Sequence, residues 1–490
     1  MRFIRPVHLR YALFVLLLAL PTALVVSCAT NPVTGKREFS LVTADQEIAM
    51  GKEGYPAVVA EYGLYDDPAL AAYVNGIGQK LAKVSEMPTL QWHFTVLDDP
   101  TVNAFAMPGG YIYITRGILA HLESEAQLAG VMGHEIGHVT ARHSAKQITQ
   151  QQLTGLGLGL AGAFSESFRQ YSGAASQALG LLMLKYGRDD ENQSDDLGVR
   201  YTTAAGWDPR EIPGTYLTLQ RISATSGSRL PSFLSTHPDP GDRQQRTTAL
   251  SSAAAAGKTG LVVGQRVFLE HLRGVVFGDD PRQGYFEADR YYHPGMAFEM
   301  SFPAGWATQN GRSAVLAQES GKQAAMQMSL ATNAKTLSPG EYVAALQRDG
   351  RITSAEGRTE TIGGYPAWVG RMSVPNGQGG TQVLVTSFVR QAPDRMLQFL
   401  AQAATAELES RVVASVRTLR PLQDAARRSP TPARLRVGQA PSGGAFSVVY
   451  PKLGTVGLDV SQAAIMNGVE PEEGIASGQW LKSVEAGRRR

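Results

Sequence analysis

The motif HEIGH at residues 134–138 contains side chains that can bind and use a metal ion. On a helix, His134 and His138 lie four positions apart and share one face, so both imidazoles can reach a single ion. Glu135 lies next to that face, where its carboxylate can take a proton from a water held by the metal. Two surface histidines at helical spacing are the competing interpretation. The motif favours a catalytic zinc site with Glu135 as the general base.

A third zinc ligand must come from elsewhere in the chain, because a catalytic zinc ion needs three protein ligands and an open position for water. Ser144 occupies the position where the pattern HExxHxxGxxH would place a third histidine, so that class is excluded. Glu191 can supply a carboxylate from a later helix, and Asp195, four positions on, can orient a ligand histidine. A solvated acidic helix face is the bland interpretation of the same residues. Three neighbours could replace Glu191 as a ligand: Asp189, Asp190 and Asp196.

The segments around these residues predict a helix-rich domain with a small sheet. Thr43 and Gln46 form a capping-box pattern, and Asp67 before Pro68 is typical of the start of a second helix. The alternating segments at 91–97 and 109–117 predict strands. A single helical run is expected over about 123–146, and a charged helix follows Tyr186.

The remaining chain predicts two further units. The Ala-rich run at 251–260 is interpreted as a linker, after which strand-like and helix-like segments indicate an α+β domain with a mostly antiparallel sheet. A basic linker at 425–436 precedes a last small segment. The fold class is therefore α+β, with a metallopeptidase domain at 28–250, an α+β domain of unknown role at 260–422 and a small module at 433–486.

The N-terminal sequence predicts export. A basic start is followed by a nearly continuous apolar run that ends at Val25-Val26-Ser27-Cys28, which is the layout of a lipoprotein signal peptide over residues 1–27. Cys28 is the only cysteine of the chain, and we expect it to be lipidated. The residue after Cys28 is Ala29 rather than an aspartate. In lipoproteins of this kind, that choice of residue favours sorting to the outer membrane. The predicted location is periplasmic, with the protein attached to the membrane by its lipid.

The composition excludes some classes of partner. The 490 residues carry a formal net charge of only +3, and the basic residues form no long block, so no nucleic-acid partner is expected. A hydrophobic content of 43% argues against general disorder.

Four blocks of sequence resemble the zinc metallopeptidases that include the CAAX prenyl protease, HtpX and BepA. They are NAFAMPGGYIYITRGIL, GHEIGHVTARH, YGRDDENQSDDLGVRY and LSTHPDPGDR, and they span about 103–243. The segment NPVTGKREFSLVT is similar to the lipoprotein branch of the family. The resemblance implies one Zn²⁺ per chain bound by His134, His138 and Glu191, with Asp195 orienting a ligand.

The same resemblance assigns His237 and Arg243 to the active site. His237 would either stabilise the negatively charged oxygen that develops during the reaction or bind the zinc as an inhibitory latch, and a structural turn is the competing interpretation. Extended substrates would pair with the strand Tyr111–Thr115. The implied function is a zinc-dependent endopeptidase that degrades misfolded or misassembled envelope proteins.

The C-terminal segment resembles a degenerate LysM module in its second half, around residues 466–468 and 478–482. LysM modules bind peptidoglycan, so peptidoglycan is a further expected ligand. The alternative to a peptidase is a non-catalytic envelope lipoprotein whose last two domains bind partners or cell wall. The intact Glu135 argues against it, because a structural metal site needs no base. Hydrolysis of a bond other than a peptide bond is a second alternative, which the resemblance disfavours.

Overall fold

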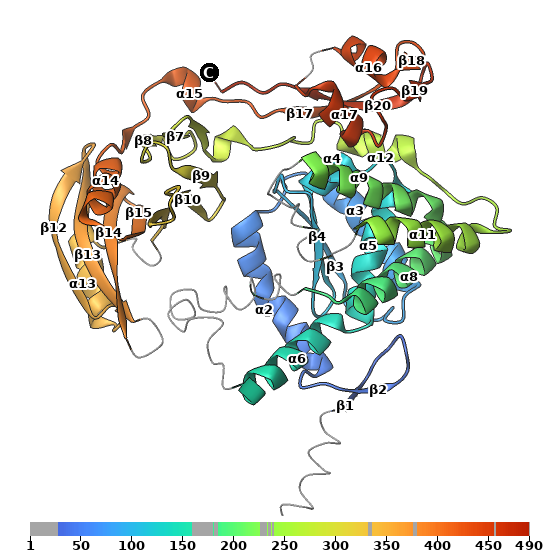
Figure 1. The fold of residues 1–490 in the computed structure, drawn as a ribbon, viewed down its shortest axis with the longest axis horizontal. Helices are drawn as coiled ribbons and strands as arrows, with labels where there is room; N and C mark the ends of the chain where they lie inside the picture. The colour runs from blue at the N-terminus through green and yellow to red at the C-terminus, as the bar shows by residue number, and fades with distance from the viewer. Residues whose placement is uncertain are drawn as a thin grey trace, which may run out of the picture.

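The computed structural model describes residues 28–158, 180, 185–225, 233, 237, 240–331, 336–375, 380–454 and 457–489. Figure 1 shows a helical region at the right, a strongly curved sheet at the left and a small C-terminal module above the helical region. This mixture of helices and sheets confirms the predicted α+β class and the helix-rich catalytic region. The predicted signal peptide lies outside the described residues.

The helical region begins with two helices whose starts follow the sequence signals. Helix α2 (Ala44–Tyr62) starts at the capping box of Thr43 and Gln46, and α3 (Pro68–Lys83) starts at Asp67, whose carboxylate accepts from the Leu70 amide. Helix α3 places four apolar side chains on one face: Leu70, Val74, Ile77 and Leu81. These side chains are buried between the helices and the sheet.

A three-stranded sheet supports the site, with the order β3 (His93–Leu97), β5 (Tyr111–Thr115), β4 (Ala104–Met107). Strand β5 pairs in parallel with β3 on one side and antiparallel with β4 on the other. Both edges of β5 are therefore occupied, and the expectation that substrates pair with Tyr111–Thr115 is wrong. The sequence shows that β5 is a strand, but strand order depends on long-range pairing.

The predicted helix over 123–146 is divided into two. Helix α4 (Arg116–His121) precedes α5 (Glu125–Thr140), which carries the HEIGH motif, and α6 (His143–Leu158) follows. The break falls at Arg142, whose backbone is left-handed with φ of 57°. A left-handed residue turns the chain out of the helix axis, so α6 runs in a new direction.

Four more elements lie around α5 or on the helices beside it. Helix α8 (Arg188–Ala204) packs along it, η1 (Pro209–Glu211) leads into α9 (Ile212–Thr225), and α11 (Pro240–Ala255) packs on α8 and α9. Helix α11 continues to Ala255, so the first half of the segment interpreted as a linker is helical. Alanine is the best helix former, which explains why the Ala-rich run continues the helix.

The middle part of the chain forms two sheets. Strands β6 (Tyr285–Glu287), β7 (Arg290–His293) and β8 (Phe298–Ser301) form a small sheet with β16 (Arg420–Pro421). The large sheet has the order β12-β13-β14-β15-β11-β10-β9, and every pairing in it is antiparallel. Its strands are β9 (Ala307–Asn310), β10 (Ala314–Gln318), β11 (Ala324–Leu330), β12 (Ser354–Ile362), β13 (Tyr365–Pro375), β14 (Thr381–Ala392) and β15 (Arg395–Ala403). Helices α13 (Pro339–Arg348) and α14 (Ala406–Val416) pack on this sheet.

The C-terminal module has its own small core but also joins the core of the helical region. Strands β17 (Arg434–Gln439) and β20 (Trp480–Glu485) pair antiparallel, as do β18 (Gly444–Ala445) and β19 (Gly474–Ile475). Between them lie α16 (Phe446–Val449), η3 (Tyr450–Leu453) and α17 (Val460–Met466). Buried residues of β17, α17 and β20 belong to one hydrophobic cluster with α3, α5 and α12 (Gln265–Leu272). That cluster therefore includes residues on both sides of the predicted boundaries at 250–260 and 433.

Among the described residues, no helix is both long and apolar enough to cross a membrane.

Candidate active site

Close packing of α5 against α8 brings the two sequence motifs together. A Cβ atom added to Gly198 of α8 would lie 3.0 Å from the backbone nitrogen of His134, and one added to Gly137 of α5 would lie 3.2 Å from the Ser194 Cα. Any larger residue at these positions would push the helices apart. The glycines thus let the backbone of α8 approach that of α5, so Glu191 and Asp195 reach the HEIGH histidines.

Four buried side chains converge on one point: His134, His138, Glu191 and His237 each offer an atom, and these atoms all lie within 4.8 Å of one another. The Nε2 atoms of His134 and His138 are 3.0 Å apart. The carboxylate of Glu191 lies 3.5 Å from His134 Nε2 and 3.4 Å from His138 Nε2. His237 Nδ1 lies 2.9 Å from Glu191 and 3.4 Å from His134 Nε2.

These spacings fit a tetrahedral zinc ion. Zinc–nitrogen and zinc–oxygen bonds of about 2.0–2.1 Å place neighbouring ligand atoms of a tetrahedron roughly 3.3 Å apart. The donor atoms here are 2.9–3.5 Å apart along the measured edges. Three imidazoles and one carboxylate are also donors that zinc prefers. The chemistry and the geometry of the cluster therefore both suit zinc.

A buried network around Arg243 holds the ligands in place. The guanidinium of Arg243 lies 2.7 Å from Glu191 and donates to both oxygens of Asp195 at 2.7 and 2.9 Å. Asp195 in turn lies 3.0 Å from Nδ1 of His134 and accepts from the Tyr216 hydroxyl at 2.6 Å. Although burial opposes it, the Arg243 charge keeps the pKa of Asp195 below its usual range. Asp195 is thus ionised and orients the His134 ring.

Glu135 lies beside the cluster with both carboxylate oxygens buried and without a hydrogen-bond partner in the structure. Its side chain is 1% exposed, and the nearest cationic group is His237, whose Nε2 is 3.7 Å away. Burial raises the pKa of Glu135, and the neighbouring histidines offset this rise only in part. A buried carboxylate with free lone pairs and a raised pKa has the properties of a general base.

His237 completes the cluster from a distant part of the chain. Its ring stacks on Phe233 with centroids 4.5 Å apart and points Nδ1 at Glu191. Burial lowers the pKa of His237, but the carboxylates of Glu191 and Glu135 outweigh that effect and raise it overall. The structure therefore places His237 among the side chains that could hold a metal ion, with its Nε2 on the side of Glu135.

His143 follows the HEIGH motif in the sequence, where its register predicts a hydrogen-bonding histidine away from the metal. Its Nδ1 lies 3.0 Å from His138 Nδ1, and it does not belong to the donor cluster. Two tyrosines of the site were not predicted: Tyr216 bridges Arg243 and Asp195, and Tyr186 stacks on His138 with centroids 3.9 Å apart. Tyrosines at no fixed spacing from a motif cannot be recognised without the fold. Of the three alternative acids, Asp190 forms an ion pair with Lys146, Asp196 one with Arg246, and none of the three belongs to the donor cluster.

The site is closed in this structure. His134, Glu135, His138, Glu191, His237 and Arg243 are each 3% exposed or less. A hollow of about 10 Å³ beside His134 is lined by Val131, Ile212, Thr215, Tyr216 and Phe233, among others, and is no larger than a water molecule needs. No peptide can enter without movement of the surrounding chain.

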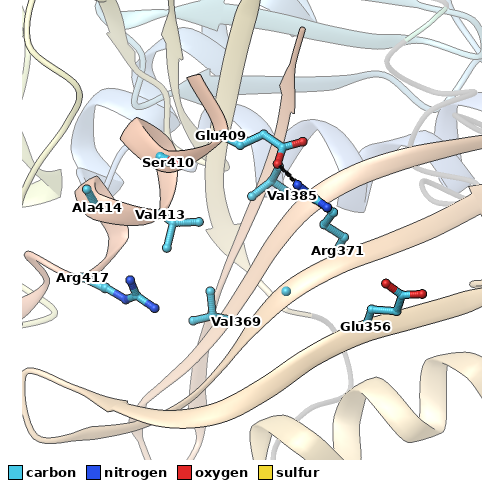
Figure 2. Close-up of a pocket in the computed structure, with 10 residues that line it drawn as sticks. Glu356, Val369, Arg371, Val385, Glu409, Ser410, Val413, Ala414 and Arg417 are labelled. Atoms are coloured by element: carbon cyan, nitrogen blue, oxygen red, sulfur yellow. Dashed lines mark hydrogen bonds and ion pairs between the residues drawn. The ribbon is translucent and has the colours of Figure 1, made fainter. Parts of the chain in front are cut away.

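A larger hollow of about 400 Å³ lies on the middle domain, between α14 and strands β12–β14. Figure 2 shows its apolar floor with Val369, Val385 and Val413 and the ion pair between Arg371 and Glu409 at its rim. None of its lining residues is a histidine or cysteine, and the carboxylate of Glu409 is paired with Arg371.

Comparison with known proteins identifies the region that contains the donor cluster. Residues 68–251 match Peptidase family M48. The mitochondrial metalloendopeptidase OMA1 of Schizosaccharomyces pombe is 33% identical over 217 residues, which cover 42% of this chain and 61% of the relative. The beta-barrel assembly-enhancing protease of Escherichia coli K12 is 29% identical over 225 residues, covering 44% of this chain and 46% of its own. The chain thus spans about half the length of these relatives.

Proposed function

We propose that the chain is a zinc-dependent endopeptidase of the bacterial cell envelope, and the match of residues 68–251 to Peptidase family M48 supports this proposal. The donor cluster carries the proposal, because three imidazoles and a carboxylate lie at zinc spacing next to a carboxylate that has no other partner. In this assignment His134, His138 and Glu191 bind one zinc ion and Glu135 is the base.

The side chains divide the chemistry among them. When bound, zinc would polarise the scissile carbonyl and lower the pKa of water from ~15.7 towards 7. Glu135 takes the proton from the attacking water and delivers it to the leaving amine, and its free oxygens make both transfers feasible. Arg243 does not act as an acid or base, because its guanidinium is held by Glu191, Asp195 and Tyr216. Arg243 instead holds the carboxylates of Glu191 and Asp195 in place, and these carboxylates position the metal-binding side chains.

His237 serves as a latch in this proposal. Its Nδ1 lies in the donor cluster, where it would complete a four-ligand zinc site and leave no position for water. The closed surroundings agree with such an inactive state. Movement of His237 would open the fourth position to water and substrate. The alternative role, a donor to the negative oxygen of the substrate, predicts the opposite effect of removing His237 on activity.

The edge strand β4 is the candidate for substrate pairing, in place of β5. It has β5 on one side only and packs against α5, so a peptide added antiparallel to it would run beside the HEIGH helix. Main-chain pairing recognises extended chains with little regard to sequence. Such recognition suits the degradation of misfolded or misassembled envelope proteins. The name of the Escherichia coli relative, a beta-barrel assembly-enhancing protease, supports that substrate class.

The location and the last module complete the proposal. Export and lipidation at Cys28 would anchor the chain to the periplasmic face of a membrane, with Ala29 favouring the outer membrane. The module at 433–486 has the order β17, β18, α16, η3, α17, β19, β20, and the pairing of its outer strands β17 and β20 around the helices supports a LysM-like peptidoglycan-binding role. The second candidate, a non-catalytic lipoprotein, is disfavoured by the buried carboxylate of Glu135, whose oxygens have no hydrogen-bond partner in the structure.

Zinc content and casein cleavage of Glu135→Gln test the proposal. The variant should keep about one zinc per chain and lose most proteolysis, by about a hundredfold or more, because the amide cannot take a proton. Glu53→Gln is the matched control, since Glu53 is an exposed residue on α2. Undiminished cleavage by Glu135→Gln, or a purified wild-type chain that cleaves without zinc, would contradict the mechanism.

A further inference from the structure

Exposed apolar side chains gather at the point where the chain leaves its N-terminal segment. Eleven large apolar side chains of the described residues are exposed, and three of them lie within ten residues: Phe39, Leu41 and Ile48, at 43%, 39% and 44%. Phe39 ends β2 (Arg37–Phe39), Leu41 follows it, and Ile48 lies in the first turns of α2. Figure 1 shows β1, β2 and the start of α2 at one end of the helical region.

The position of this apolar face relative to the anchor is fixed by strand pairing. Strand β1 (Cys28–Thr30) pairs antiparallel with β2, and Cys28 lies directly opposite Phe39. Opposed residues of such a pair have Cα atoms about 4.5–5.5 Å apart. The apolar run of the sequence ends just before Cys28. A lipid on Cys28 would therefore leave the protein next to Phe39.

The same segment is tied to the end of the catalytic helix. The Asn31 side chain donates to the Ala141 carbonyl at 3.1 Å in a buried contact. Arg142 donates to the Val42 carbonyl at 2.9 Å and to Glu47 at 2.7 Å. These bonds join residues 31–47 to the C-terminal end of α5, directly after the HEIGH motif.

The connection limits the distance between anchor and metal site. Ala141 lies three positions after His138, and each position along a helix adds about 1.5 Å. The Asn31–Ala141 hydrogen bond and the three residues from Asn31 back to Cys28 add at most about 10 Å each. The Cα atoms of His138 and Cys28 are therefore at most roughly 25 Å apart.

We propose that Phe39, Leu41 and Ile48 form a membrane-contact face that inserts into the lipid surface beside Cys28 and holds the metal cluster at a short, fixed distance from the bilayer. The peptidase would then act on polypeptide segments that emerge at the membrane surface rather than on chains free in solution. The inference rests on the proposed peptidase function and on membrane anchoring at residues 1–28. Exposed apolar side chains beside an anchor add the second contact that orients a protein on a membrane.

Environment-sensitive labels test the face directly. Phe39→Cys, Leu41→Cys and Ile48→Cys are each made in the full chain, labelled with a nitrobenzoxadiazole fluorophore and reconstituted into vesicles of phosphatidylethanolamine and phosphatidylglycerol. Val448→Cys is the matched control, because Val448 is 56% exposed on α16, at the opposite end of the molecule from β1. The wild-type chain, treated with the same fluorophore, shows whether Cys28 itself becomes labelled.

Doxyl-labelled lipid should quench the three labels at least about twofold more than the label at position 448. Bound protein with equal quenching at all four positions would overturn the membrane-contact face while leaving the anchor and the peptidase intact. A chain that does not bind vesicles would overturn both the location and this inference.

A second measurement concerns the substrate. The triple variant Phe39→Ser, Leu41→Ser, Ile48→Ser should cleave casein in detergent at the wild-type rate but cleave a vesicle-tethered peptide several-fold more slowly. Equal rates of the triple variant and the wild type on the tethered peptide would refute the proposed substrate class. A wild-type chain that does not cleave casein would refute the proposed peptidase function.

Discussion

Lys482 of the C-terminal module should stabilise the peptidase region, and replacing it with methionine tests this. The Lys482 side chain is completely buried and donates to the carbonyls of Ala120 and Leu122, at 2.9 and 2.6 Å, and to Glu123 at 3.0 Å. These acceptors run from Ala120 in the last turn of α4 to Glu123, the residue before Ser124, which is the N-cap of α5. Lys482 thus fixes the loop from which the catalytic helix starts.

The magnitude follows from the groups that Lys482→Met would leave behind. Removing one partner of a buried ion pair destabilises a protein by about 3–5 kcal/mol, because the other charge loses its compensation. Glu123 is 15% exposed and regains some hydration, but the two carbonyls lose a donor as well. We therefore expect the free energy of opening of the Leu122–Ser124 segment to fall by about 4 kcal/mol, which is roughly a thousandfold increase in amide exchange.

Hydrogen exchange of the peptide that contains Leu122–Gln127 measures this change. Lys452→Met is the matched control, since Lys452 is an exposed lysine of the same module, and its one side-chain hydrogen bond within the described part of the chain goes to Ser442 at 3.3 Å. Such surface changes stay within about 0.5 kcal/mol. The double variant Glu123→Gln, Lys482→Met should recover part of the loss, because the unpaired charge is removed. A loss below about 1 kcal/mol for Lys482→Met, or no difference from Lys452→Met, would refute the reasoning.

Three further predictions concern the metal site. His134→Ala should remove zinc, measured by metal analysis against His271→Ala, and full occupancy in the variant would exclude His134 as a ligand. Asp195→Asn should weaken zinc binding about 10–100-fold in a chelator competition, because the amide no longer orients His134 as a charged acceptor. The control Asp196→Asn, on the exposed face of α8, should not weaken it. Equal zinc affinities of the two variants would contradict the orienting role of Asp195. His237→Ala should raise basal and self-cleavage, and a tenfold rise would mean that the latched state is favoured by about 1.4 kcal/mol; unchanged cleavage of casein and of the chain itself would leave only a structural turn.

Local patterns in the sequence predicted what local geometry dictates. The four-residue spacing of His134 and His138 places both rings on one face of a helix whatever the rest of the fold does, and the same holds for Glu191 and Asp195 on α8. The helix starts at Thr43 and Asp67 were also predicted, because a capping side chain bonds within three residues of itself. The α+β class followed from the alternation of such local patterns.

Only the tertiary structure decided which distant groups meet. His237 lies 99 positions after His138 in the chain, yet its Nδ1 joins the donor cluster. Strand order made β5 central and left β4 at the edge, and a left-handed Arg142 divided the predicted helix. Lys482 became part of the peptidase core through packing across more than 350 residues. Such contacts depend on side-chain packing and hydrogen bonding between separate elements, and no spacing within a single element encodes them.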